Sequence, residues 1–125
     1  MERTNNLRIT SMTPLVSPEE LKVELPISSS AEATVIQGRR TVQRILWGED
    51  SRLLAVVGPC SIHDPEVGYD YARRLAELRR RVEKQLFVVM RVYFEKPRTR
   101  LGWRGLILDP ALDGSYDIPR GLRTA

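Results

Sequence analysis

Two short apolar runs, separated by one amphipathic segment, constrain the fold of this chain more than any other feature. Leu53 to Val57 is a continuous apolar run closed by Gly58-Pro59. Leu86 to Tyr93, interrupted only by Arg91, is a second run rich in β-branched and aromatic residues. Such runs are typical of strands buried on both faces of a parallel sheet. The sequence therefore predicts two parallel strands, with the segment between the two runs as their connection.

The segment between the two runs has the pattern of a helix. Asp64-Pro65-Glu66 offers an N-cap, a proline at the first helical position and an acid in the first turn. Apolar residues then recur every three or four positions from Tyr71 to Val82. The run Arg79-Arg80-Arg81 lies inside this helix, where a solvated face explains it. Strand, helix and strand together predict a βαβ unit with a right-handed crossover.

The first fifty residues predict an arm followed by two helices. Residues 1–16 show no sustained period and indicate an arm that docks on another surface or is loose. Ser17-Pro18-Glu19-Glu20 has the form of a capping box, and Pro26 ends the short helix that it begins. The three serines from Ser28 offer an N-cap for a second helix that ends at Gly48. We therefore divide the chain into an arm and helical extension, residues 1–50, and an α/β part, residues 51–125.

Composition excludes several classes of protein. No apolar run approaches the roughly 20 residues of a membrane helix, and the N-terminus leads into no apolar signal region. One cysteine among 125 residues agrees with a reducing compartment, which predicts a cytoplasmic protein. The net charge of +4 suggests an anionic partner. Because the basic residues do not cluster with aromatic ones, nucleic-acid binding is not expected.

The loop after the first predicted strand is a candidate site, since loops at the carboxyl ends of strands carry the chemistry of α/β folds. It runs from Gly58 to Asp64 and places Cys60 just beyond the strand. A thiolate there could bind a metal or act as a nucleophile, whereas a lone cysteine is also commonly a small buried hydrophobe. Cys60 and His63 have a spacing that suits zinc, but no second pair completes four ligands. His63 is therefore better interpreted as a hydrogen-bonding loop residue.

The loop after the second predicted strand is cationic. Arg91 places a guanidinium among apolar neighbours near the strand end, which is costly unless the charge meets an anion. Further along, the loop carries more donors around a stiffening proline: Lys96, Pro97, Arg98, Thr99, Arg100 and Arg104. Arginine forks and a lysine point charge suit phosphate recognition. A basic surface loop is the alternative that the spacing alone leaves open.

These loops closely resemble a known family, the bacterial type I 3-deoxy-D-arabino-heptulosonate 7-phosphate (DAHP) synthases. The resemblance rests on Gly58 to Asp64 and on Met90 to Thr99, two long motifs in the right order. Further likeness runs through shorter segments: Leu7-Arg8-Ile9, Gly102 to Leu106, Asp109-Pro110 and Asp113 to Tyr116. It spans essentially the whole chain, but only about the N-terminal third of a family member.

The resemblance implies an enzyme that condenses phosphoenolpyruvate with erythrose 4-phosphate, at the start of the shikimate pathway of aromatic amino acid biosynthesis. Cys60 matches the family's thiolate ligand of an essential divalent metal, whose identity (Mn, Fe, Co or Zn) is left open. Arg91 and Lys96 match residues that hold phosphoenolpyruvate, and Lys96 with Cys60 is assigned to the catalytic set. The loop of Lys96, Pro97, Arg98 and Thr99 matches the family's site for erythrose 4-phosphate. Intact members form homo-oligomers.

The implied fold is an α/β one: an N-terminal helical extension plus the first βαβ unit of a (β/α)8 barrel, truncated. A barrel of this kind takes about 250 residues, roughly twice the length of this chain. The remaining metal ligands would then lie beyond Ala125, and we expect the chain to be inactive by itself. The alternative is a non-enzymatic module that docks through residues 1–50 onto a full-length synthase and alters its assembly or regulation.

Overall fold

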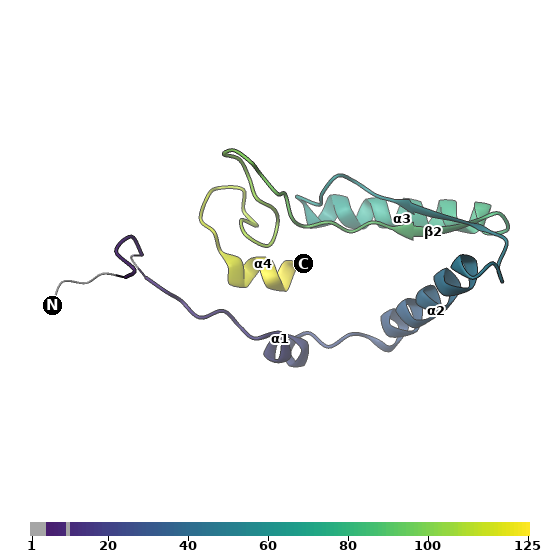
Figure 1. Ribbon diagram of the computed structural model, residues 1–125, viewed down its shortest axis with the longest axis horizontal. Coiled ribbons are helices and arrows are strands. Elements are labelled where there is room, and N and C mark those ends of the chain that lie inside the picture. Colours follow the sequence, from purple (N-terminus) through teal and green to yellow (C-terminus); the bar gives the residue numbers. More distant parts are fainter. Residues whose placement is uncertain (1–4, 10) are drawn as a thin grey trace.

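A two-stranded parallel sheet with one crossover helix forms the centre of the structure (Figure 1). The computed structural model describes residues 5–9 and 11–125, so the expectation of an arm over residues 1–16 lies partly outside the described residues, at 1–4 and 10. Strand β1 (Leu53–Val57) pairs with β2 (Leu86–Met90) in a register that runs from Leu53 opposite Leu86 to Val57 opposite Met90. Helix α3 (Pro65–Val82) connects them and begins at the N-cap Asp64. The predicted βαβ unit is present.

Two helices precede the sheet and begin where their caps predict. Helix α1 (Pro18–Glu24) has a complete capping box: the Glu20 amide donates to Ser17 Oγ at 3.2 Å, and the Ser17 amide donates to Glu20 Oε2 at 2.9 Å. Helix α2 (Ser29–Leu46) is capped by Ser28 and is followed by Gly48 at a φ of 77°. Figure 1 shows α1 and α2 one after the other along one side of the molecule.

A short helix, α4 (Ile118–Thr124), ends the chain. It begins after the N-cap Asp117, whose carboxylate accepts the Arg120 amide at 3.1 Å. The Arg123 guanidinium donates to both carboxylate oxygens of Glu24, at 2.6 and 2.9 Å. This two-pronged ion pair joins α4 to α1, which lie near one another in Figure 1.

Two expectations about the strands are wrong. Strand β1 is not buried on both faces, since Leu53 is 70% and Val56 58% exposed. With only two strands in the described part of the chain, nothing pairs with the outer edge of β1. Strand β2 ends at Met90 and not at Tyr93, because Met90 lies opposite Val57, the last residue of β1.

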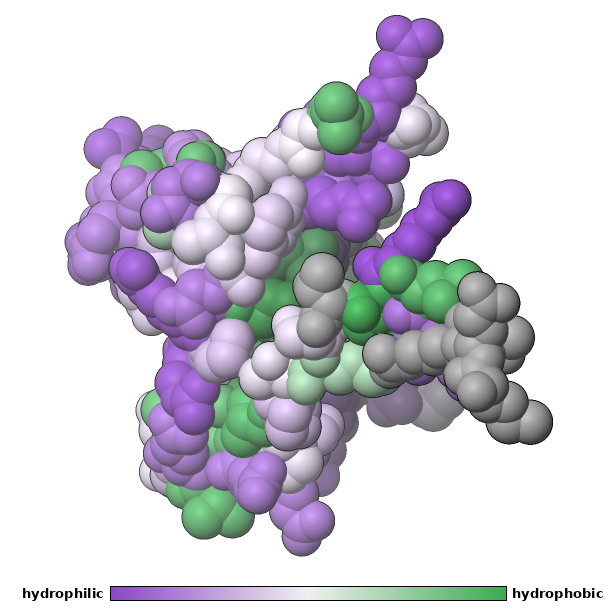
Figure 2. Space-filling view, turned by 90° about the vertical axis from the view of Figure 1, so that its left-hand side faces the viewer, coloured by the Kyte–Doolittle hydropathy of each residue, from purple (hydrophilic) through white to green (hydrophobic). Residues whose placement is uncertain are grey.

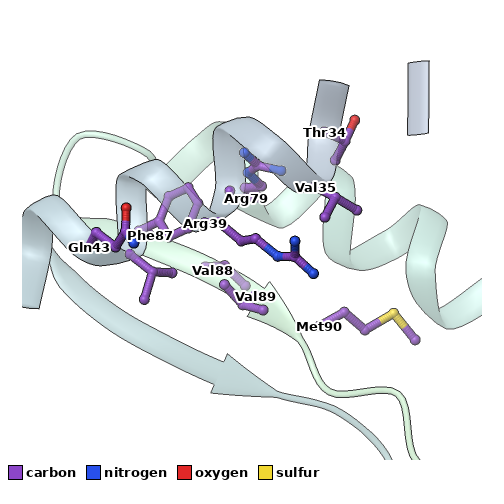
Figure 3. Close-up of a pocket in the computed structure, with 11 residues that line it drawn as sticks. Thr34, Val35, Arg39, Gln43, Arg79, Phe87, Val88, Val89 and Met90 are labelled. Atoms are coloured by element: carbon purple, nitrogen blue, oxygen red, sulfur yellow. The ribbon is translucent and has the colours of Figure 1, made fainter. Parts of the chain in front are cut away.

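The buried core is small. Among the described residues the buried apolar side chains are four: Ile62, Phe87, Val88 and Leu106. A hollow of about 600 Å³ separates α2 from β2, and side chains from the two elements face one another across it (Figure 3). Figure 2, a view onto one end of the molecule, shows apolar surface gathered in a recess between more hydrophilic parts. None of the described helices is long and apolar enough to cross a membrane.

Candidate functional site

The loops that follow β1 and β2 stay paired beyond the strands. The Arg91 amide donates to the Val57 carbonyl at 2.7 Å, and the Ile62 amide donates to the Tyr93 carbonyl at 2.8 Å. Between these bonds, Gly58 lies so close to the Arg91 backbone that a Cβ on Gly58 would collide with it. A glycine is therefore required for the close approach of the two loops. Their side chains are brought to one end of the sheet, as the parallel topology predicts.

Cys60 and Lys96 meet at this end of the sheet. The Lys96 ammonium lies 2.7 Å from the Cys60 thiol sulfur, although the two residues are 36 positions apart. The hydrogen bond from Lys96 lowers the pKa of the Cys60 thiol, helped by the positive charges of Lys96 and Arg91. Cys60 is exposed, which excludes the alternative of a small buried hydrophobe. The arrangement favours an accessible thiolate, the form that binds metals and attacks electrophiles.

Arg91 supports the turn that carries Cys60. One of its terminal nitrogens, Nη2, donates to the Pro59 carbonyl at 3.1 Å and to the Cys60 carbonyl at 2.7 Å. Its guanidinium carbon lies 5.4 Å from the centre of the Tyr93 ring, within the range of a cation–π contact. Arg91 directly follows β2 and so lies near the strand end, as expected, but it is exposed and not buried among apolar neighbours. Its position at the end of the sheet leaves other guanidinium donors facing solvent.

The remaining predicted residues lie further along the second loop. Pro97, Arg98 and Thr99 are exposed, and Lys96 is half-buried. Arg98 Nε donates to the Trp103 carbonyl at 3.1 Å, which holds this guanidinium against its own loop. Within the described residues, no hydrogen bond links Arg98 or Thr99 to the contact between Cys60 and Lys96. The structure thus brings Cys60, Arg91 and Lys96 together and leaves Arg98 and Thr99 apart from them.

One buried polar residue was named in the sequence analysis only as part of a short segment of family likeness, with no role of its own. Asp109 is 6% exposed and is the buried charged residue of the described chain. Its carboxylate accepts the Gly114 amide, and its carbonyl accepts the Trp103 indole. The sequence held only a weak signal, because Asp109-Pro110 within a segment rich in glycine and proline has the composition of an ordinary turn.

The donors near Cys60 fit one position of a metal site, but not a whole one. A thiol with a lowered pKa is a suitable ligand for a divalent metal. The described residues contain no group of three or more His, Cys, Asp or Glu that could hold a metal ion together. His63, the other candidate in the first loop, is exposed. Other ligands of any metal bound by Cys60 would therefore come from outside these residues.

Comparison with known proteins gives a consistent result. The model of the DAHP synthetase I family matches residues 24–125. A phospho-2-dehydro-3-deoxyheptonate aldolase of Amycolatopsis methanolica is 54% identical over 99% of this chain and 61% of its own length. A Tyr-sensitive enzyme of the same name from Salmonella typhimurium is 53% identical over 97% of this chain and 34% of its own length.

A solved structure agrees with both relatives. The phospho-2-dehydro-3-deoxyheptonate aldolase of Francisella tularensis superposes with a TM-score of 0.88 at 44% sequence identity. The match covers 93% of this chain and 34% of the Francisella chain. This chain therefore spans about a third of the length of the Salmonella and Francisella proteins, and 61% of the Amycolatopsis one.

Proposed function

Because this chain belongs to the DAHP synthetase I family, we propose that its two loops are substrate-binding loops of a DAHP synthase. The enzyme would condense phosphoenolpyruvate with erythrose 4-phosphate and water to give DAHP and phosphate. One observation carries the proposal: Cys60, Lys96 and Arg91 meet beyond the ends of two adjacent parallel strands. Residues 1–50 would form a helical extension, and residues 51–125 the first part of a (β/α)8 barrel, in which sites lie at the carboxyl ends of the strands.

Arg91 and Lys96 would hold phosphoenolpyruvate. This substrate carries a carboxylate and a phosphate, and both are anions that arginine and lysine bind well. Arg91 uses Nη2 for the turn carbonyls and retains other donors for a ligand. Lys96 is half-buried beside Cys60, so its charge is less screened by water than that of a surface lysine. The pair would orient the enol carbon towards the second substrate.

Arg98 and Thr99 would hold the phosphate of erythrose 4-phosphate. Arg98 commits only Nε, to the Trp103 carbonyl, and a guanidinium has five donors. Thr99 is exposed on the same loop and adds a hydroxyl donor. Pro97 lies between Lys96 and Arg98 and restricts the backbone that sets their separation. The loop would in this way place the two phosphorylated substrates side by side.

The bonds of the reaction define what the site has to do. C3 of phosphoenolpyruvate bonds to the aldehyde carbon of erythrose 4-phosphate, water adds at C2, and the bond from C2 to the phosphate oxygen breaks. A divalent metal held in part by the Cys60 thiolate would supply Lewis acidity for the aldehyde or for the water. Arg91 and Lys96 would stabilise the negative charge of the departing phosphate. The single free cysteine agrees with a reaction in the reducing cytoplasm.

A chimaera tests the proposal. Residues 1–125 are joined to the part of the Francisella protein that follows the matched region, and DAHP formation is measured with both substrates and a divalent metal. We expect turnover that requires both substrates and is lost when a chelator removes the metal. A folded, metal-loaded chimaera without turnover would contradict the proposal. The family match does not favour the alternative of a non-enzymatic docking module.

Replacing Arg98 in the chimaera should affect one substrate more than the other. We expect Arg98→Ala to raise the KM for erythrose 4-phosphate by about tenfold to a hundredfold, since a hydrogen bond to a charged group contributes about 1.5–3 kcal/mol. The KM for phosphoenolpyruvate should change little. Steady-state kinetics with each substrate varied in turn gives both constants. Arg81→Ala serves as the control, because Arg81 is exposed on α3, away from the proposed site. It should leave the KM values for both substrates unchanged.

The contact between Lys96 and Cys60 predicts a pH dependence. Because Lys96 lowers the pKa of the Cys60 thiol, the thiolate is populated at lower pH than in an ordinary cysteine. In metal-free buffer, Lys96→Gln should move the midpoint of Cys60 alkylation by iodoacetamide to higher pH. Peptide-resolved mass spectrometry of the chimaera measures this profile for Cys60 alone. The control Lys84→Gln should give the wild-type midpoint, and an unchanged midpoint in Lys96→Gln would contradict the contact.

The arm would contribute to a homo-oligomer. Its described part exposes four large apolar side chains: Leu7, Ile9, Met12 and Leu15, between 48% and 77% exposed. Apolar side chains gathered on an exposed segment favour a protein–protein contact. Light scattering on the chimaera with and without residues 1–16 tests this. We expect a smaller assembly without the arm, and an unchanged mass would exclude a role of the arm in assembly.

A further inference from the structure

The segment from Gly102 to Gly114 was conspicuous in the sequence, yet the proposed chemistry uses none of its residues. It pairs with the proposed substrate loop as an antiparallel partner. An isolated β-bridge joins Glu95 to Gly105. On one side of it the Lys96 amide donates to the Arg104 carbonyl at 2.8 Å, and on the other the Leu106 amide donates to the Phe94 carbonyl at 2.8 Å. Gly105 has a φ of 124° and approaches the Phe94 backbone so closely that a Cβ would collide with it. The backbone around Lys96 therefore depends on the segment opposite.

Asp109 ties that segment together. Its amide donates to the Gly105 carbonyl at 3.0 Å, and its own carbonyl accepts the Trp103 indole Nε1 at 2.8 Å. Both carboxylate oxygens accept the Gly114 amide, each at 3.2 Å. A carboxylate that is 6% exposed is costly unless its oxygens are hydrogen-bonded, and here both are. Asp109 therefore joins three points of the segment at one buried position.

Two hydrogen bonds, both made by Trp103, connect Asp109 to Arg98. Trp103 accepts Arg98 Nε at its carbonyl, at 3.1 Å, and donates its indole to Asp109. Gly102 lies against the same guanidinium, since a Cβ on Gly102 would come within 3.4 Å of Arg98 Nε. Trp103 is half-buried, whereas Arg98 is exposed. An exposed arginine is thus held by a residue that is itself anchored in the interior.

We propose that Asp109 is a positioning residue, which acts through Trp103 to fix the direction in which Arg98 presents its free donors. The inference rests on the proposed function for the identity of the ligand, the phosphate of erythrose 4-phosphate. Asp109 does not touch the substrate and contributes no proton. Its carboxylate holds the backbone turn through the Gly114 amide, which keeps its own carbonyl in place to accept the Trp103 indole, and the Trp103 carbonyl in turn orients the guanidinium. An arginine held in this way loses less side-chain freedom when the phosphate binds.

Hydrogen exchange of the chimaera tests the positioning without requiring activity. In Asp109→Ala and in Trp103→Phe, which removes the indole donor but keeps an aromatic ring, we expect the amides of 94–106 to lose protection while β2 keeps its own. Asp109→Asn keeps an acceptor oxygen and should restore much of the protection. Asp113→Ala removes an exposed carboxylate from the same segment and serves as the matched control. Unchanged protection at 94–106 in both Asp109→Ala and Trp103→Phe, or a loss that extends equally to β2, would overturn the inference.

Kinetics of an active chimaera adds a second test through Arg98. We expect Asp109→Ala and Trp103→Phe to raise the KM for erythrose 4-phosphate by about tenfold or more. This lies within the roughly 10²-fold loss that a 1 Å misplacement of a binding group can cause. In an Arg98→Ala background the same replacements should have little further effect, because they act through Arg98. Fully additive effects, or equal increases in both KM values, would overturn the inference. An inactive wild-type chimaera with the expected exchange pattern would instead contradict the proposed function alone.

Discussion

Replacing Cys60 by alanine is expected to lower the kcat of the chimaera by about 10³-fold or more, since Lewis-acid stabilisation contributes several kcal/mol and each 1.36 kcal/mol is a factor of ten. The reason is local. Cys60 is the one cysteine of the chain and is exposed, and the Lys96 ammonium, 2.7 Å from its sulfur, lowers the pKa of the thiol. Alanine removes the sulfur that would bind the metal. The loop should keep its fold, because Gly58 and Arg91 hold it through contacts with the backbone. Stopped assays with saturating metal and both substrates measure the loss.

Substrate affinity separates a lost ligand from a damaged loop. Calorimetric titration of phosphoenolpyruvate into Cys60→Ala, in metal-free buffer, should give an affinity close to that of the unmodified chimaera. Arg91 and Lys96 remain in place, and Lys96 is released from its contact with the thiol. A variant that keeps its kcat would exclude Cys60 from the chemistry. A variant that loses phosphoenolpyruvate binding as well would assign Cys60 a structural role.

The polypeptide of residues 1–125 alone is expected to show neither turnover nor a cooperative thermal transition. The structure of this stretch buries few apolar side chains, and β1 exposes Leu53 and Val56. Its two-stranded sheet has free edges along both outer sides, which invite pairing with other chains. Ordering each residue costs roughly 1–2 kcal/mol in conformational entropy, and so small a core offsets little of that cost. We expect aggregation or a dynamic, partly helical state.

The helices should persist longest in such a state. Residues 17–25 and 64–84 carry their own caps, so their helicity depends least on the rest of the fold. Circular dichroism during heating and exchange of backbone amides measure this, with the chimaera as the folded reference. A soluble monomer that unfolds in one cooperative step, or turnover by the purified 125-residue chain, would show the expectation to be wrong.

The elements that sequence reasoning placed well are those whose signals are local. The capping box at Ser17 and the Asp64 cap each lie within four residues of the helix that they start. The βαβ order followed from two apolar runs around one amphipathic segment, and the parallel pairing confirms it. The DAHP synthase resemblance rested on two continuous motifs, and the family match confirms it. All of these depend on neighbours in sequence.

The properties that sequence reasoning missed depend on distant contacts. Burial of β1 was inferred from its composition, but burial requires elements that cover both faces of the strand, and the described residues leave Leu53 and Val56 exposed. Asp109 lies in a segment of family likeness, but no local pattern predicts its burial, and its contacts with the Trp103 indole and the Gly114 amide become visible only in the structure. Cys60 and Lys96 are 36 positions apart in the sequence. The parallel topology predicted that both would lie at the same end of the sheet, but not that they would be in contact.

A crystal structure of the chimaera with zinc and both substrates, or their unreactive analogues, tests the central claim most directly. The claim is that the loops after β1 and β2 form one site for a metal and two phosphorylated ligands. Anomalous scattering should place zinc about 2.3 Å from Cys60 Sγ. One phosphate should lie within about 3 Å of the free Arg98 donors, and the other anion beside Arg91 and Lys96. Zinc bound away from Cys60, or phosphates bound away from both loops, would contradict the account.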